Sequence, residues 1–227
     1  MFLTRIADYN FLIKNQYDHV RDQCGDYIIP GGDPDFVIEV SEEEIAAEQD
    51  GAFSPVYLES IAVYRKIARS LFPHHSFVLH GVVLEVDSVG IAFLAGSGTG
   101  KSTHAALWKQ TLGEKVTVIN GDKPIIRLFD HKLAAYGTPW AGKEGEQANR
   151  SCMLQKICFL ERGVENQCIR LSGKDLFYRV LPFVYTENGI QALDALQILN
   201  QVELEYFSLK CNVDISAAEI AYREMML

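Results

Sequence analysis

Residues 95–103 combine the residue types that hold a phosphate group, in the order Ala-Gly-Ser-Gly-Thr-Gly-Lys-Ser-Thr. Glycine allows backbone conformations that turn several N–H groups toward one anion, and a helix that starts next to the loop adds the positive end of its dipole. Lys101 suits the β- and γ-phosphates of a nucleoside triphosphate, and the hydroxyl of Ser102 suits Mg²⁺. We therefore predict a phosphate-binding loop, with ligand contacts from Gly96, Ser97, Gly98, Thr99, Gly100, Lys101, Ser102 and Thr103.

The segments on either side of this loop have the patterns that such a motif requires. Residues 90–94 form a short apolar run, typical of a buried strand, and residues 102–112 are rich in the helix formers Ala, Leu and Lys. Ala95 stands where the usual pattern has glycine, a mild departure because the position needs a small residue. The alternative is an ordinary glycine-rich turn before a helix, and the Lys-Ser pair argues against it.

A carboxylate is expected near the loop, at the end of the next predicted strand. Residues 116–119 read as a strand that ends in Asn120-Gly121-Asp122. Asp122 can hold Mg²⁺ or accept the proton of an attacking hydroxyl group. Since Asn-Gly-Asp is also favourable in a hairpin turn, a purely structural role for Asp122 is the alternative.

His80 lies on a predicted strand, residues 77–86, which leads into the strand before the loop. The two-residue period of a strand places it on one face with Val78, Val82 and Leu84. This pattern favours a core histidine bonded to a backbone carbonyl, with an active-site role as the alternative.

The segment 137–146 has the composition of a loop and carries further candidates. Trp140 either stacks on a ligand or anchors the loop to the core, and the sequence favours neither. Glu144 and Glu146 are candidate metal ligands, although solvated glutamates are the commoner case. Arg150, just beyond, is a candidate for a phosphate contact.

The elements that must position these residues predict a mixed α/β fold (α+β) in two parts. Residues 1–50 are acidic and strand-rich, with β-prone runs at 11–13, 27–29 and 36–40 and a capping box, Ser41 with Glu44, that starts a short helix. We interpret this part as a small sheet packed on the main domain; a cover that sets substrate specificity is the alternative. Residues 51–227 form the second part. Its further predicted elements are a helix from Ser54-Pro55, a hairpin of strands 125–129 and 132–136, strands 157–160, 168–171 and 202–206, and helices 172–182, 190–199 and 217–226.

Composition limits the classes of protein that fit. With 227 residues, 48% of them hydrophobic, the chain suffices for one core and a small subdomain. A net charge of -9 argues against a nucleic-acid surface. Neither a signal-peptide pattern nor an apolar run long enough to cross a bilayer is evident, so no membrane partner is expected. The 5 scattered cysteines lack metal-ligand spacing and indicate reduced thiols in a cytoplasmic protein.

The segment from His80 to Asp122 resembles the catalytic core of bacterial HPr kinase/phosphorylase and its relatives. Three features carry the resemblance. They are Leu79-His80-Gly81, with the histidine 15 residues ahead of Ala95 (95 − 80); the loop in the form Gly-Ser-Gly-x-Gly-Lys-Ser; and an acidic strand end 21 residues after Lys101 (122 − 101). About the middle third of the chain is covered, and the rest matches in the order of elements.

This resemblance implies a P-loop nucleotide-binding fold, shared with phosphoenolpyruvate carboxykinase, and ATP and Mg²⁺ as cofactors. It implies three catalytic residues: Lys101 on the phosphates, His80 in the active site and Asp122 as the base, with Mg²⁺ held by Ser102 and Asp122. Gly121 departs from the family, which has an aspartate there. Members of the family form oligomers, so by analogy a homo-oligomer is expected.

These patterns together predict an ATP-dependent, Mg²⁺-dependent kinase. It would transfer the γ-phosphoryl group to a hydroxyl acceptor, either a seryl side chain of a protein or peptide or a small metabolite. The alternative is a regulatory module that binds ATP without turnover, which the missing aspartate at Gly121 favours. A third interpretation is a structural protein with a chance glycine-rich turn.

Overall fold

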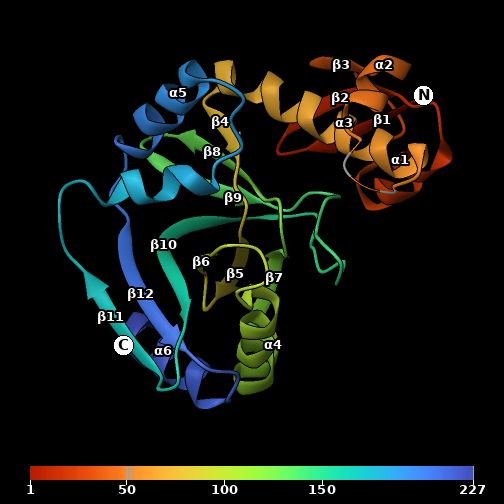
Figure 1. The fold of residues 1–227 in the computed structure, drawn as a ribbon. Helices are drawn as coiled ribbons and strands as arrows, with labels where there is room; N and C mark the ends of the chain where they lie inside the picture. The colour runs from red at the N-terminus through yellow and green to blue at the C-terminus, as the bar shows by residue number, and fades with distance from the viewer. Residues whose placement is uncertain (50, 52, 227) are drawn as a thin grey trace. The chain divides into compact units, whose positions relative to one another are not determined.

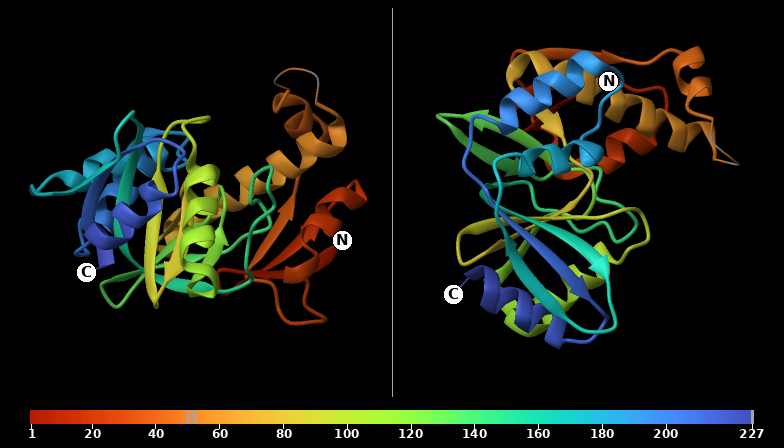
Figure 2. Two further views of the ribbon diagram at one scale, coloured as in Figure 1. Left: turned by 90° about the horizontal axis from the view of Figure 1, so that it is seen from below. Right: turned by 60° about the vertical axis from the view of Figure 1, so that its left-hand side comes forward.

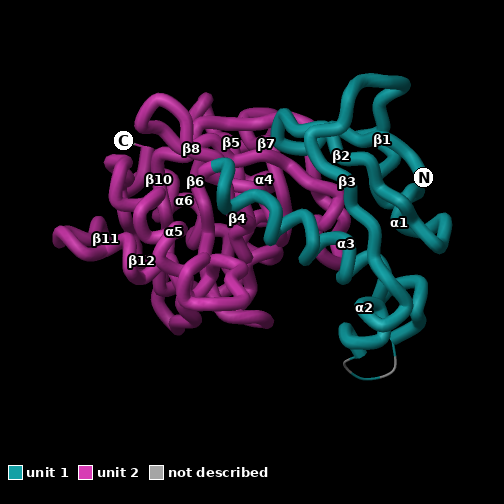
Figure 3. Tube along the Cα trace, turned by 90° about the horizontal axis from the view of Figure 1, so that it is seen from above, with its two compact units in different colours: residues 1–74 teal, residues 75–227 magenta. Residues whose placement is uncertain are grey.

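The computed structural model, drawn in Figure 1, describes residues 1–49, 51 and 53–226. The chain divides into two compact units, Met1–His74 and His75–Leu227, which Figure 3 colours separately. The sequence placed a boundary after residue 50, which lies outside the described residues. The structure places the division after His74, so the helix that begins at Pro55 belongs to the first unit.

The first unit holds a small sheet with helices beside it. β1 (Phe2–Ile6) and β2 (Tyr9–Lys14) form an antiparallel hairpin, and β3 (Phe36–Glu39) pairs with β2 in parallel. The helical segments are α1 (Asp18–Gln23), η1 (Gly25–Tyr27), α2 (Glu42–Ala47), α3 (Pro55–Leu71) and η2 (Phe72–His74). The capping box that opens α2 and the Ser54 cap that opens α3 form as predicted.

One predicted strand of this unit, residues 27–29, is wrong. Gly25–Tyr27 forms a 3-10 turn, and beyond it Ile28 makes a single bridge to Thr4. The hydroxyl of Thr4 also donates to the carbonyl of Tyr27 at 2.9 Å. A β-prone run becomes a strand only where a partner strand is available along its length, and this run has a turn in its place.

The second unit is built on a curled, mixed sheet. Its described strands run in the order β4-β8-β9-β10-β6-β5-β7, with β12 paired to β10 and β11 to β12. One edge of the long strand β10 (Ser151–Arg162) pairs first with antiparallel β9 and then with parallel β12, while its other edge pairs with β6. The remaining bounds are β4 (Ser76–Val78), β5 (Val82–Val86), β6 (Val89–Leu94), β7 (Val116–Asn120), β8 (Ile125–Phe129), β9 (Lys132–Tyr136), β11 (Gln167–Leu171) and β12 (Glu205–Cys211).

Two helices cover one face of this sheet. α4 (Lys101–Leu112) follows β6 directly, and α6 (Ser216–Met226) contacts it and β12 (Figure 2). Their apolar side chains join those of the sheet in one core around the fully buried Trp108 and Phe93. The other helical segments of the unit are η3 (Gly113–Lys115), η4 (Leu176–Phe183) and α5 (Gly189–Leu199). The mixed α/β class predicted from the sequence is confirmed at this level.

The predicted strand 77–86 is broken in the middle. β4 ends at Val78 and β5 begins at Val82, and the backbone N–H groups between them bond to two other segments. The N–H of Leu79 donates to the backbone carbonyl of Pro124, that of His80 to the carbonyl of Phe183, and that of Gly81 to the carbonyl of Asp122. A Cβ atom at Gly81 would lie 3.0 Å from the carbonyl oxygen of Phe93 and 2.6 Å from the side chain of Leu94, so a larger residue would have to displace its neighbours. His80 therefore does not share a strand face with Val78, Val82 and Leu84.

Three further boundaries differ from the prediction. β10 is longer than the predicted strand 157–160 at both ends. The prediction was too short because polar residues such as Gln155 and Lys156 interrupt the apolar pattern. The strand predicted at 202–206 is found at Glu205–Cys211. The predicted helix 172–182 is a 3-10 segment that contains Pro182. Within the described residues, none of the helices combines the length and apolar character that crossing a bilayer demands.

Candidate functional site

The glycine-rich loop joins β6 to α4, in the strand–loop–helix order that the sequence predicted. Gly98 and Gly100 have φ angles of 74° and 121°, a region that residues with a Cβ atom rarely adopt. Gly100 is the N-cap of α4, and its carbonyl accepts a hydrogen bond from the N–H of His104 at 2.9 Å. The loop thus ends at a helix N-terminus, where the dipole of the helix favours an anion.

Lys101, the first residue of α4, points back over the loop. Its side chain is buried, and Nζ donates to the carbonyl oxygen of Ala95 at 2.9 Å. Nζ also lies 3.4 Å from Nε2 of His80. Burial lowers the pKa of Lys101, the charge of Asp122 raises it, and Lys123 lowers it again, with a net shift downward.

His80 and Asp122 face Lys101 from neighbouring segments. Nε2 of His80 lies 3.4 Å from Oδ1 of Asp122, and Nζ of Lys123 lies 3.5 Å from the same oxygen. Burial lowers the pKa of His80, and Lys123 and Lys101 lower it further, against the opposing charge of Asp122. His80 is therefore a neutral imidazole at neutral pH, placed between an ammonium group and a carboxylate.

A buried asparagine holds Asp122 in place. Oδ1 of Asn120 accepts hydrogen bonds from the N–H groups of Asp122, at 2.9 Å, and Lys123, at 2.6 Å. Nδ2 of Asn120 donates to the carbonyl of Thr138 at 3.0 Å. Because Asn120 is fully buried, the turn that carries Asp122 is tied to the core of the unit.

Gly121, where the resembled family has an aspartate, is packed against backbone. A Cβ atom there would lie 2.8 Å from the carbonyl oxygen of Ala141 and 3.2 Å from that of Glu146. The N–H of Gly121 also donates to Glu146 at 3.0 Å. The loop after Trp140 therefore takes the space that a second carboxylate would need.

These residues line one cleft of about 470 Å³. Its lining consists of His80, Ser97, Gly98, Gly100, Lys101, Ser102, Thr103, Gly121, Asp122, Lys123, Gly142, Lys143 and Glu144. In this lining the lysines outnumber the carboxylates, although the chain as a whole carries a net charge of -9. A basic cleft in an acidic protein favours an anionic ligand. Two predicted loop contacts, Gly96 and Thr99, are not among its lining residues.

The candidate side chains of the segment 137–150 differ in whether they line the cleft. The side chain of Trp140 is buried, which supports the role of an anchor, and the backbone N–H of Trp140 donates to the hydroxyl of Thr138. Glu144 lines the cleft. Glu146 forms an ion pair with Lys109 at 2.6 Å, and Arg150 pairs with Glu85, so both side chains are engaged elsewhere.

Sequence reasoning missed three basic residues. Lys123 directly follows Asp122, so its position at the cleft was readable from the chain. Lys143 lies beside Glu144 in the loop 137–146 and also lines the cleft. Arg162, at the end of β10, donates to the carbonyl oxygens of Gly98 and Thr99 and braces the loop from outside. No local pattern links Arg162 to the loop, because parallel pairing of β10 with β6 brings them together.

The oxygen donors at the cleft fit Mg²⁺ only together with phosphate. Ser102 and Asp122 offer one hydroxyl and one carboxylate. Mg²⁺ keeps several waters and is commonly held by one or two carboxylates plus substrate phosphates. Among the described residues, no cluster of His, Cys, Asp or Glu could hold a metal by itself. A metal here would therefore need a phosphate-bearing ligand to complete its coordination.

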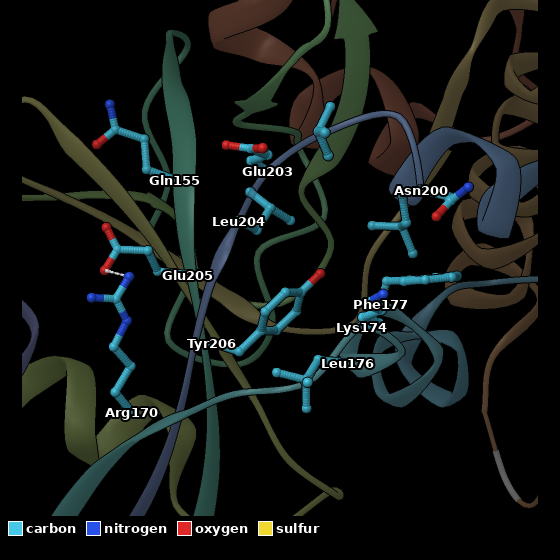
Figure 4. A pocket seen from close by; sticks show the side chains of 13 residues that line it. Gln155, Arg170, Lys174, Leu176, Phe177, Asn200, Glu203, Leu204, Glu205 and Tyr206 are labelled. Carbon is cyan, nitrogen blue, oxygen red and sulfur yellow. Dashed lines mark ion pairs between the residues drawn. The ribbon is translucent and has the colours of Figure 1, made fainter.

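A larger cavity, of about 620 Å³, lies elsewhere in the second unit and holds none of the predicted site residues (Figure 4). It lies along β11, β12 and the segment before η4. Arg170 and Glu205 form an ion pair in its wall, at 3.2 Å. Glu205 also pairs with Lys156, so the charges there largely neutralise one another. The smaller cleft remains the better candidate, because its charge and glycine-rich backbone point to one kind of ligand.

Comparisons with known proteins give a distant likeness of fold. No family model and no curated protein sequence matches the chain. Among solved structures, the HPr(Ser) kinase/phosphatase from Coxiella burnetii matches with 8% sequence identity and a TM-score of 0.40. The match covers 64% of this chain and 94% of that one. At this level the likeness carries no argument about activity, which must come from the site itself.

Proposed function

We propose that this protein is an ATP-dependent kinase that transfers the γ-phosphoryl group to a hydroxyl acceptor. The observation that carries the proposal is a group of three side chains at the loop: Nε2 of His80 lies 3.4 Å from Nζ of Lys101 and 3.4 Å from Oδ1 of Asp122. A cation on a glycine-rich loop binds the phosphates, and a carboxylate opposite it can receive the acceptor's proton. The resemblance of the segment 80–122 to HPr kinase/phosphorylase agrees with this assignment.

The chain's own residues supply positioning and charge. Lys101 and the loop hold the phosphate tail. Asp122, fixed by Asn120, takes the hydroxyl proton as the acceptor oxygen bonds to the γ-phosphorus and the bond from that phosphorus to the departing ADP breaks. His80 stays neutral, and its Nε2 can either accept a hydrogen bond from Lys101 or, in the other tautomer, donate one to Asp122. Bound Mg²⁺, on Ser102 and Asp122, would neutralise charge on the transferred group. Little covalent help from the protein is needed in such a transfer.

The acceptor is expected to be polar. Lys123, Lys143 and Glu144 line the same cleft and offer hydrogen bonds and charge to a hydroxyl-bearing molecule. A seryl side chain and a small metabolite both meet this requirement. A cytoplasmic location and a homo-oligomeric state remain part of the proposal, the second by family analogy alone.

A transfer assay tests the proposal. The protein is incubated with Mg²⁺ and ATP labelled at the γ-phosphate, and with panels of proteins, serine peptides and sugar alcohols. Asp122→Asn should lower turnover by about 100-fold or more, because a positioned general base contributes at least that much, while ATP binding persists. Asp130→Asn, the same change at an exposed aspartate outside the cleft, is the matched control and should keep the activity. ATP binding without transfer to any acceptor would count against a kinase.

A non-catalytic ATP-binding module is the second candidate. Its specific support is the packing at Gly121, which leaves Asp122 as the single carboxylate on that turn. Under this alternative, wild type and Asp122→Asn would bind ATP alike, and neither would turn it over.

A further inference from the structure

A second cavity, of about 410 Å³, lies on the other side of the glycine-rich loop. It shares Gly98, Gly100 and Thr103 with the cleft of the proposed active site. Its other walls come from α4, the end of β10 and the segment after β12. The two spaces therefore border the same stretch of the loop, and a ligand that extends past Thr103 would enter both.

The chemistry of the second cavity differs from that of the first. Leu107, Leu160 and Val213 contribute apolar surface, and Arg162 is the charged residue of its lining. The guanidinium of Arg162 is already engaged with the carbonyl oxygens of Gly98 and Thr99. A mostly apolar pocket with a few polar groups suits a flat, uncharged ring rather than a phosphate.

His104 adds a buried polar group to this cavity. Its side chain is 2% exposed, and its Nε2 accepts a hydrogen bond from Nε1 of Trp108 at 2.8 Å. A neutral imidazole that accepts at Nε2 carries its proton on Nδ1. In the part of the chain that the structure describes, Nδ1 of His104 has no hydrogen-bond partner. A buried donor without a partner is costly, and a small rotation of the ring toward a ligand acceptor in the cavity would remove that cost.

We propose that this cavity binds the nucleoside end of the nucleotide, with the base against Leu107 and Val213 and a ring nitrogen or carbonyl of the base within reach of His104. The inference rests on the proposed function, since it requires the phosphate tail to lie in the neighbouring cleft. Thr103, common to both spaces, marks the point where the phosphate tail gives way to the sugar.

The test compares two probes, ATP and inorganic tripolyphosphate, each with Mg²⁺, by calorimetry. Val213 is 77% exposed at the rim of the cavity, so Val213→Trp should fold and fill it. We expect this variant to bind ATP about tenfold more weakly, a loss of about 1.4 kcal/mol, and to bind tripolyphosphate as wild type does. Val164→Trp is the matched control, because Val164 is also exposed but does not line the cavity. It should bind both probes normally.

The outcomes separate the two proposals. If Val213→Trp binds ATP like wild type, or if it weakens both probes equally, the base lies elsewhere and this inference fails while ATP binding stands. Equal affinity of wild type for ATP and tripolyphosphate would also overturn it, because the base would then contribute nothing. If wild type binds neither probe, the proposed function itself fails. Thermal unfolding of Val213→Trp confirms that the variant is folded.

Discussion

At the scale of single residues, His104 shows how a polar group is kept in the core beside the loop. It packs against Phe93 and accepts a hydrogen bond from Trp108. Burial lowers its pKa from 6.5 to about 4, so the native protein holds the neutral ring. This tautomer, with Nε2 as acceptor, places the proton on Nδ1, which has no hydrogen-bond partner among the described residues.

The same residue predicts a loss of stability in mild acid. Between pH 6.5 and pH 4 the unfolded chain binds a proton at His104 and the native protein does not, so the free energy of unfolding falls as the pH is lowered. From pH 7 to pH 4.5 the contribution is roughly 2 kcal/mol, measurable by urea unfolding. His104→Gln keeps an acceptor for Trp108 but does not titrate. A variant with the same pH dependence as wild type would contradict the buried, neutral histidine.

At the scale of elements, the end of β10 braces the loop that precedes α4. Arg162 is exposed, yet its guanidinium donates to the carbonyl oxygens of Gly98 and Thr99, with Nε 3.2 Å from the latter. We predict that Arg162→Ala weakens ATP binding about threefold to tenfold and changes the free energy of unfolding by less than about 0.5 kcal/mol. Titration of ATP and urea unfolding measure the two effects. Arg170→Ala, an exposed arginine on β11, is the control, and an equal loss of affinity there would contradict a local brace.

The turn at Gly121 packs against the loop after Trp140, and this contact leads to a prediction about stability. A Cβ atom at Gly121 would lie 2.8 Å from the carbonyl oxygen of Ala141, so Gly121→Ala forces one of the two segments to move. Overpacking of this sort costs about 1–3 kcal/mol of unfolding free energy. Gly189→Ala, at the start of α5 with open space around it, should cost little. Similar unfolding midpoints for both variants would show that the turn at Gly121 is loosely packed.

Local signals predicted much of the arrangement around the site. Caps at Ser41 and Ser54, the hairpin of β8 and β9 and the order β6–loop–α4 were readable, because each depends on residues close together in the chain. The break at Gly81 was not, since it depends on hydrogen bonds to segments around residues 122–124 and 183. The contact of Arg162 with the loop likewise depends on parallel strand pairing, which no local pattern encodes.

At the scale of the whole molecule, the lining of the proposed nucleotide site belongs to one unit. All residues that line the two spaces beside the loop lie between positions 80 and 213, within the second unit. The first unit contributes its own sheet and helices, and Phe11, Ile13 and Val63 within it are fully buried. A ligand stabilises only the structure that must be intact to bind it.

We therefore predict that Mg²⁺ and ATP slow amide hydrogen exchange in the second unit and not in the first. At a ligand concentration of about 100 times the dissociation constant, stabilisation amounts to about 2.7 kcal/mol, enough to slow exchange strongly in the unit that binds. We expect protection at the loop 95–103 and the turn 120–123, read out by mass spectrometry of peptides, and unchanged exchange in residues 1–74. Lys101→Ala, as the control, should show no protection at either segment. Protection that extends through residues 1–74 would mean that the two units respond to the nucleotide as one, because their local openings would then share a single free energy of unfolding.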